Sequence, residues 1–249
     1  MLNISAKQME AFRQYQLEKH AERVDRLLVA IEPGFAEALT EAEIRRISET
    51  VVANAGLVHF DDDTQFHDFA QFSVYFGTGF LTDPQCLWAN RLFLNRRELV
   101  DGRALAVAGK GAIAREWGPN GTVARKVIAR AALDLENLKE RSLTAHASLP
   151  QLTASLIALW PERAEGLGPV RLERLALDHV RRARALGATG PVLLIFVAVF
   201  FILGSMADED PLFPWFNSLR GSAVADSRAV VDQLLQRLPA TALVTGGRA

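Results

Sequence analysis

Among the local clusters of side chains in this sequence, residues 59–67 most resemble a metal-binding site. His59, Asp61-Asp62-Asp63 and His67 are all residue types that coordinate zinc or similar ions. The same carboxylates are common where a loop enters a helix, because they accept hydrogen bonds from its first amides and interact favourably with its dipole. We favour this capping interpretation and expect neither a bound metal nor a cofactor.

The remaining candidates for catalysis are isolated side chains. His20, His146 and His179 each stand alone among helix-forming residues. Asp178 precedes His179, but neighbouring residues on a helix point about 100° apart, which keeps the carboxylate away from the ring. The glycine–lysine–glycine segment at 109–111 lacks the spacing of a phosphate-binding loop, and no strand precedes it. Nucleophile-elbow, zinc-protease and dinucleotide-binding motifs are also missing from the sequence, which therefore predicts a protein that is not an enzyme.

Composition narrows the class of protein further. The 249 residues are 49% hydrophobic and 23% charged, which is ordinary for a soluble globular protein with a sizeable core. A net charge of −1 gives no indication of nucleic acid as a partner. Cys86 is the single cysteine, which excludes an internal disulfide and a cysteine-rich zinc site. The N-terminal residues lack the pattern of a signal peptide, so we expect a cytoplasmic protein.

Two stretches of the chain, residues 69–92 and 196–219, match each other at a fixed offset of 127 residues. The matching pairs are Gly77 and Gly204, Asp83-Pro84 and Asp210-Pro211, Trp88 and Trp215, Asn90 and Asn217, and Leu92 and Leu219. A further run of identities at an offset of 128 relates residues 28–39 to 156–167. We infer a duplicated helical unit, residues 28–92 and 156–219, with connecting helices in residues 93–150.

Each unit is expected to contain a corner between two helices. Gly77 and Gly204 are suited to the left-handed position just past a helix end. Asp83 and Asp210 are predicted to cap the next helix, with Pro84 and Pro211 as its first residues. These six residues are therefore expected to be structural. Trp88 and Leu92 lie four residues apart, as do Trp215 and Leu219, so each pair can pack on one helical face.

Helical periodicity predicts a single all-α domain over residues 1–249, an orthogonal helical bundle without strands. Helices are expected at about residues 5–31, 40–55, 62–76, 88–97, 101–116, 122–141, 151–160, 172–187, 191–203 and 226–238. Ser5 with Gln8, Thr40 and Asp62 with Gln65 provide the first three helix starts. Residues 241–249 are expected to form a loose tail.

The most apolar segment, residues 185–207, contains no charge over 23 residues and is long enough to cross a bilayer. Gly187, Gly190 and Pro191 shorten its helix to about residues 191–203, or roughly 20 Å against the ~30 Å of a hydrocarbon core. The matching helix of the first unit also carries polar residues. We favour a buried core helix, and membrane insertion through Val192–Leu203 is the alternative.

The pattern Gly77…Phe80…Asp83-Pro84…Trp88-Ala89…Leu92, with ISAKQMEAF and PGFAEAL before it, resembles a known group of proteins. These are small helical proteins encoded beside spike and PAAR-type effector genes of bacterial type VI secretion systems. The resemblance covers about residues 1–95 and brings no catalytic residues. Cys86-Leu87 departs from the pattern, in which an aromatic residue or proline often precedes the tryptophan.

The resemblance implies a cytoplasmic adaptor or chaperone that binds a secreted effector for loading. An immunity protein that blocks a cognate toxin is one alternative, and a membrane-inserted effector or anchor is another. Partner contacts are expected in a groove between the repeats, from Trp88, Asn90, Trp215 and Asn217. The other interpretation of these four residues is structural, with the tryptophans as core anchors and the asparagines bridging helices.

Overall fold

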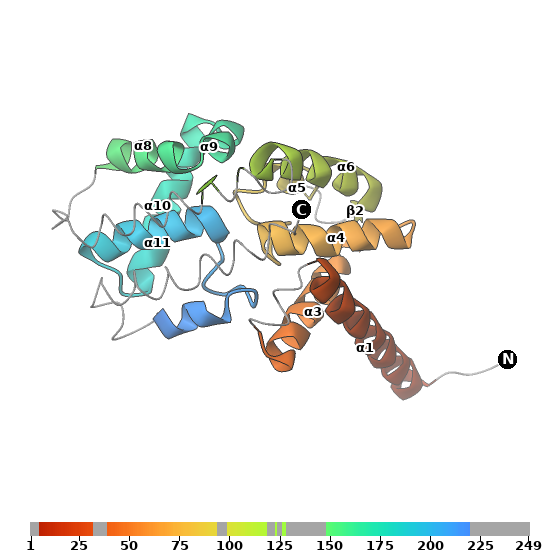
Figure 1. The fold of residues 1–249 in the computed structure, drawn as a ribbon. Helices are drawn as coiled ribbons and strands as arrows, with labels where there is room; N and C mark the ends of the chain where they lie inside the picture. The colour runs from red at the N-terminus through yellow and green to blue at the C-terminus, as the bar shows by residue number, and fades with distance from the viewer. Residues whose placement is uncertain are drawn as a thin grey trace.

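The computed structural model describes residues 5–31, 39–93, 99–118, 123, 126–127 and 148–219. These residues are mostly helical, which confirms the predicted all-α class. The two halves of the chain lie on opposite sides of the molecule, and α1 projects outward from the first half (Figure 1). One continuous hydrophobic core includes buried residues from both halves.

In the first half, the described residues form five helices around a phenylalanine-rich core. They are α1 (Ala6–Ile31), α3 (Glu41–Ala55), α4 (Asp63–Phe76), the short α5 (Leu87–Leu92) and α6 (Gly102–Ala112). Helix α6 continues into a π-helical turn, η1 (Ile113–Trp117). Phe69, Phe72 and Phe80 are fully buried where α4 meets the loop that follows it.

The second half is built around α11 (Gly190–Leu203). Helices α8 (Leu149–Leu159), α9 (Pro161–Leu167) and α10 (Pro169–Ala185) precede it, and the 3-10 helix η3 (Pro214–Leu219) follows. The α8 and α9 helices are separated only by Trp160. The end of α8 agrees with the predicted helix at 151–160, whereas the short helix α9 was not predicted. Phe196, Phe200 and Phe216 pack against one another with ring centroids 5.4 to 6.2 Å apart.

Helix starts follow the local sequence signals closely. Thr40 forms the reciprocal capping box with Glu43, and Ser5 does the same with Gln8. The carboxylate of Asp62 accepts the amide of Gln65 at 2.9 Å. Three of the predicted helix starts are therefore confirmed, because a cap depends only on residues three positions apart.

Two short strands were not predicted. Val58–His59 (β1) and Val100–Asp101 (β2) pair in parallel, with Val58 opposite Val100. Two residues are too few to show the alternation that identifies a strand. The pair fixes where α6 begins, since Gly102 follows β2 and a β-carbon there would lie 2.5 Å from the carbonyl oxygen of His59.

Corresponding elements of the two halves have matching bounds. Helices α4 and α11 both contain 14 residues, and their ends differ by 127 positions, as do those of α5 and η3. The order and spacing of these elements agree with the proposed repeat, while the duplication itself remains a prediction.

Helix α11 is an interior helix. Its side chains are buried at, among others, Ile195, Phe196, Val197, Phe200 and Phe201. Within the part of the chain that the structure describes, no helix combines the length and the apolar character needed to span a bilayer.

Several predictions concern residues outside those described. These are most of the helix at 122–141, the helix at 226–238, the tail at 241–249, and the side chains of Asn217 and Leu219. The predicted continuation of the Trp88 helix to about residue 97 is wrong, because the helix ends at Leu92 with Phe93 as its cap residue.

Candidate functional site

Asp83 does not cap the tryptophan-bearing helix, so that prediction is wrong. Its Oδ1 accepts the amide of Gln85 at 2.8 Å, and its Oδ2 accepts the amide of Ser205, 122 residues away, at 2.8 Å. Helix α5 begins only at Leu87, and its cap residue Cys86 makes no side-chain hydrogen bond. Pro84 accordingly lies in a turn before the helix.

Asp210 makes the corresponding contacts in the opposite direction. Its Oδ1 accepts the amide of Leu212 at 3.0 Å, and its Oδ2 accepts the amide of Thr78 at 2.7 Å. The Thr78 hydroxyl donates to Oδ1 at 3.0 Å. Pro211 also lies in a turn, since η3 begins at Pro214, so the capping prediction is wrong here too. Each aspartate therefore binds the residue that follows the other corner's glycine.

The two glycines are required by both conformation and space. Gly77 and Gly204 follow their helices with φ of 92° and 117°, as the predicted helix ends require. A β-carbon on Gly77 would lie 2.8 Å from Oδ2 of Asp210, and one on Gly204 would lie 3.1 Å from Oδ2 of Asp83. We call residues 77–85 the first corner and residues 204–212 the second corner.

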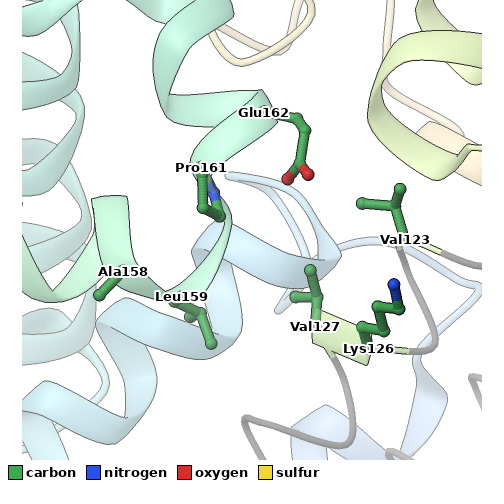
Figure 2. A pocket seen from close by; sticks show the side chains of 7 residues that line it. All are labelled: Val123, Lys126, Val127, Ala158, Leu159, Pro161 and Glu162. Atoms are coloured by element: carbon green, nitrogen blue, oxygen red, sulfur yellow. The ribbon is translucent and has the colours of Figure 1, made fainter.

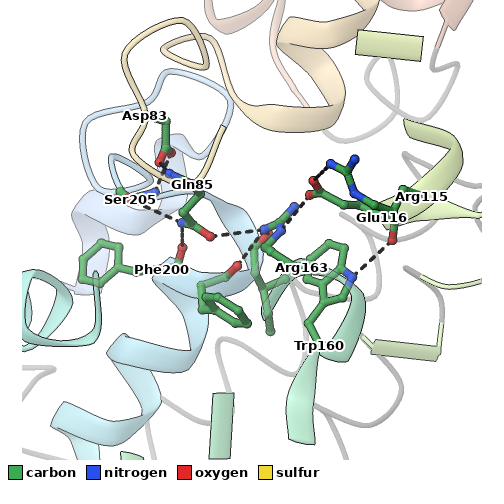
Figure 3. A network of polar contacts seen from close by, with 10 residues as sticks. Asp83, Gln85, Arg115, Glu116, Trp160, Arg163, Phe200 and Ser205 are labelled. Atoms are coloured by element: carbon green, nitrogen blue, oxygen red, sulfur yellow. Dashed lines mark hydrogen bonds and ion pairs between the residues drawn. The ribbon is translucent and has the colours of Figure 1, made fainter. Parts of the chain in front are cut away.

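A buried polar network extends from the corners into the second half (Figure 3). The guanidinium of Arg163 donates from Nε to Glu116 at 3.1 Å, and from one terminal nitrogen to the carbonyls of Phe201 and Ile202 at 2.7 and 3.1 Å. Gln85 Nε2 donates to the carbonyl of Phe200 at 2.7 Å. Side chains from α9 and the first corner therefore donate to the last carbonyls of α11. The positive charge of Arg163 is also stabilised by the negative end of the α11 helix dipole.

Trp160 packs flat against Arg163. The guanidinium carbon lies 3.7 Å from the indole centroid, and the indole nitrogen donates to the carbonyl of Glu116 at 3.2 Å. Arg163 and Glu116 are both 5% exposed, and Trp160 is 1% exposed. The position of the guanidinium is therefore fixed by one ion pair, two carbonyls and one aromatic face.

His179 and Ser205 form a pair that resembles a catalytic couple but lacks its properties. Nε2 of His179 lies 3.2 Å from the Ser205 hydroxyl. Burial lowers the pKa of His179 to about 3, which makes the neutral imidazole a weak base at physiological pH. Asp178 pairs with Arg181 at the surface. Burial also raises the pKa of the Cys86 thiol, which disfavours the nucleophilic thiolate.

The structure places Trp88 and Asn90 in scaffold contacts. The Trp88 ring is half-buried against Phe72, Phe76 and Phe80, with ring centroids 5.2 to 5.6 Å apart. Asn90 donates to the carbonyls of Asp83 and Cys86 at 2.7 and 3.1 Å, which closes the first corner. In the second half, Trp215 packs on Phe213 and Phe216. The side chain of Asn217 lies outside the described residues.

Several residues considered as metal ligands or as part of a phosphate loop have other contacts. Asp62 caps α4, and Asp63 pairs with Arg23 at 2.9 Å. Among the described residues, no group of three metal-ligand side chains could hold an ion. Gly109 lies inside α6 against the ring of Phe72, and Lys110 pairs with Asp68 at 2.7 Å.

A pocket of about 150 Å³ lies at the junction of α8 and α9. Figure 2 shows the charged ends of Glu162 and Lys126 facing the space between Pro161 and Val123. Its lining is otherwise apolar and consists of Val123, Val127, Ala158, Leu159, Pro161 and the aliphatic parts of the two charged residues. Lys126 is exposed, and Glu162 is half-buried.

In comparisons with known proteins, no family model, no curated protein and no solved structure matches the chain.

Proposed function

We propose that this chain is a non-enzymatic accessory protein that binds a secreted effector and holds it for loading in a bacterial type VI secretion system. The observation that supports a binding role is the pocket between the α8–α9 junction and Val123, with its apolar lining and two charges of opposite sign. The secretion context rests on the resemblance of residues 1–95 alone.

The size of the pocket suits one side chain of a partner. An apolar cavity of about 150 Å³ can hold a molecule of the size of benzene. A leucine or phenylalanine on an effector segment would therefore fill it. Such an anchor contributes most when the surrounding contacts exclude water, and Lys126 and Glu162 are placed to pair with opposite charges beside it.

The polar groups that could serve chemistry are, by contrast, enclosed. Asp83, Glu116, Arg163, His179 and Ser205 are each at most 6% exposed, and their hydrogen bonds join segments of the same chain. This burial favours a structural role for the network. The pocket is therefore the place where we expect a partner to bind.

The proposal is tested by filling the pocket. Ala158 is exposed and lines it, so Ala158→Phe occupies the space without disturbing the core. Ala154, one turn earlier on α8, is also exposed and does not line the pocket, so Ala154→Phe is the matched control. The variants are expressed in a host strain from which the gene for this protein has been deleted. We expect wild type and Ala154→Phe to restore secretion of the effector encoded beside this gene, and Ala158→Phe not to restore it.

Two outcomes would contradict the proposal. Normal effector secretion in the deletion strain would remove the adaptor role. Survival of cells that express the effector alone, gained only when this protein is co-expressed, would identify an immunity protein instead. Charge reversal at both Lys126 and Glu162 provides a second perturbation of the same pocket.

A further inference from the structure

Three carboxylates and one guanidinium are buried together where the two corners meet. Asp83, Asp210 and Glu116 are 3%, 9% and 5% exposed, and Arg163 is 5% exposed. Arg163 is already paired with Glu116, at 3.1 Å. The buried carboxylates therefore outnumber the buried cation. Arg163 forms its ion pair with Glu116 and not with Asp83 or Asp210.

Asp83 and Asp210 are held by neutral donors. Each accepts two backbone amides, one from its own corner and one from the other, and Asp210 also accepts the Thr78 hydroxyl. Within the described part of the chain, neither carboxylate forms an ion pair with a lysine, arginine or histidine. A buried carboxyl group without a paired cation favours its neutral form.

We propose that the two corners form a proton-linked clasp, in which exchanged carboxylates join the two halves of the molecule and the closed clasp retains a proton that the open clasp releases. The two corners do not line the proposed partner pocket, so the clasp does not depend on what binds there. It rests on the reciprocal contacts of Asp83 and Asp210 and on the excess of buried carboxylates.

Asp210 is the group that carries the proton. Burial raises its pKa from 3.8 to about 6, the hydrogen bonds from Leu212 and Thr78 oppose this increase, and the nearby charge of Asp83 adds to it. Burial also raises the pKa of Asp83, although its amide hydrogen bonds and the charge of Arg163 oppose the change. Among the residues that the structure describes, no cation opposes the shift at Asp210, and we therefore assign the proton to this carboxyl group.

The other titratable groups around the corners do not replace Asp210 in this role. His179 stays neutral because burial holds its pKa at about 3, and the Cys86 thiol stays protonated because burial raises its pKa. The remaining charged groups are already paired, namely Glu116 with Arg115 and Arg163, and Asp208 and Glu209 with Arg182.

The sign of the effect follows from the direction of the pKa shift. Asp210 binds its proton more tightly in the closed state than in the unfolded chain, where its pKa is 3.8. The stabilisation is fully present below about pH 4 and is lost as the pH rises through about 6. A shift of about two pKa units corresponds to roughly a hundredfold change in the equilibrium constant for unfolding.

The first experiment measures denaturant unfolding of the full chain between pH 4 and pH 7.5. We expect the unfolding constant of the wild type to rise across this range by roughly a hundredfold more than that of Asp210→Asn. Asp178→Asn removes an exposed carboxylate and should follow the wild type. Parallel curves for wild type and Asp210→Asn would overturn the proton linkage. If Asp210→Asn does not fold, carboxyl ¹³C NMR of the wild type decides, since a folded chain with every aspartate titrating below pH 4.5 overturns it equally.

The second experiment tests the clasp at a single pH. Cys86 directly follows the first corner, is buried, and is the only cysteine, so its alkylation reports opening of that corner. At pH 7 and without denaturant, we expect Thr78→Val to be alkylated at least tenfold faster than wild type, because it loses the hydroxyl contact to Asp210. Thr82→Val removes a hydroxyl that donates within the first corner itself, to the carbonyl of Gly79, and serves as the control. Equal rates for Thr78→Val and Thr82→Val would show that the exchanged contacts do not hold the corners together.

Discussion

Gly109 allows α6 to approach α4 closely, and replacing it with alanine should destabilise the protein. A β-carbon at this position would lie 2.4 Å from two ring carbons of Phe72. Favourable contacts between carbon atoms lie at about 3.5 to 4.0 Å, so the overlap exceeds about 1 Å. The Phe72 ring is fully buried, with Phe80 and Trp88 packed against it, so it has little freedom to move away.

Two opposing effects decide the magnitude. Alanine in place of glycine inside a helix stabilises the helix by about 1 kcal/mol. Overpacking a closed core costs about 1 to 3 kcal/mol, and more where the neighbours cannot move. For Gly109→Ala the cost should be at the upper end, which leaves a net loss of about 2 kcal/mol. Gly111, two residues later in α6, is exposed, and a β-carbon there would have no atom within 4 Å, so Gly111→Ala should gain up to about 1 kcal/mol.

Denaturant unfolding of the two variants beside wild type measures this difference. We expect Gly109→Ala and Gly111→Ala to fall on opposite sides of wild type, separated by roughly 3 kcal/mol, or several degrees in Tm. If both variants were stabilised alike, the close packing of α6 on Phe72 would be refuted. The same result would also show that Gly109 is not required for close packing on Phe72.

Two further predictions concern the network and a helix start. Arg163→Leu leaves Glu116 paired only with the half-exposed Arg115 and removes the donor to the carbonyls of Phe201 and Ile202, so it should cost about 3 kcal/mol in urea unfolding. The double variant with Glu116→Leu should recover part of that loss, and a double variant no better than the single one would contradict the ion-pair argument. Thr40→Ala removes the hydroxyl that accepts the amide of Glu43 and donates to its carboxylate, and should cost about 1 kcal/mol. Thr50→Ala, near the other end of the same helix, is its control, and an equal loss there would contradict the capping role.

Local signals predicted the helices of this fold because they act within three or four residues. Thr40, Asp62 and Ser5 cap the helices that they precede, and the apolar face of α3 is the buried one. The β1–β2 pair could not be predicted, since two residues carry no periodicity and their partners lie 42 positions apart. Helix α9 was missed because its seven residues, Pro161–Leu167, are too few to show a clear helical period.

The site was predicted less well because its contacts are long-range. Asp83 and Asp210 were recognised as structural residues, yet their partners lie more than 120 residues away and no spacing rule identifies them. Arg163 and Glu116 look like ordinary surface charges on helices. One signal was available in the sequence: the serine and threonine that follow the two glycines are also equivalent, and both serve as donors to the opposite aspartate.

The exchange of carboxylates explains why an Asp-Pro sequence did not start a helix here. An aspartate side chain accepts hydrogen bonds from the nearest unsatisfied amides, and beyond each positive-φ glycine the amide of the next residue has no partner within its own helix. Because each corner supplies the acceptor that the other lacks, neither half satisfies its buried amide alone. The two halves are therefore interdependent through their polar groups as well as through the shared core, and weakening one corner is expected to weaken the other.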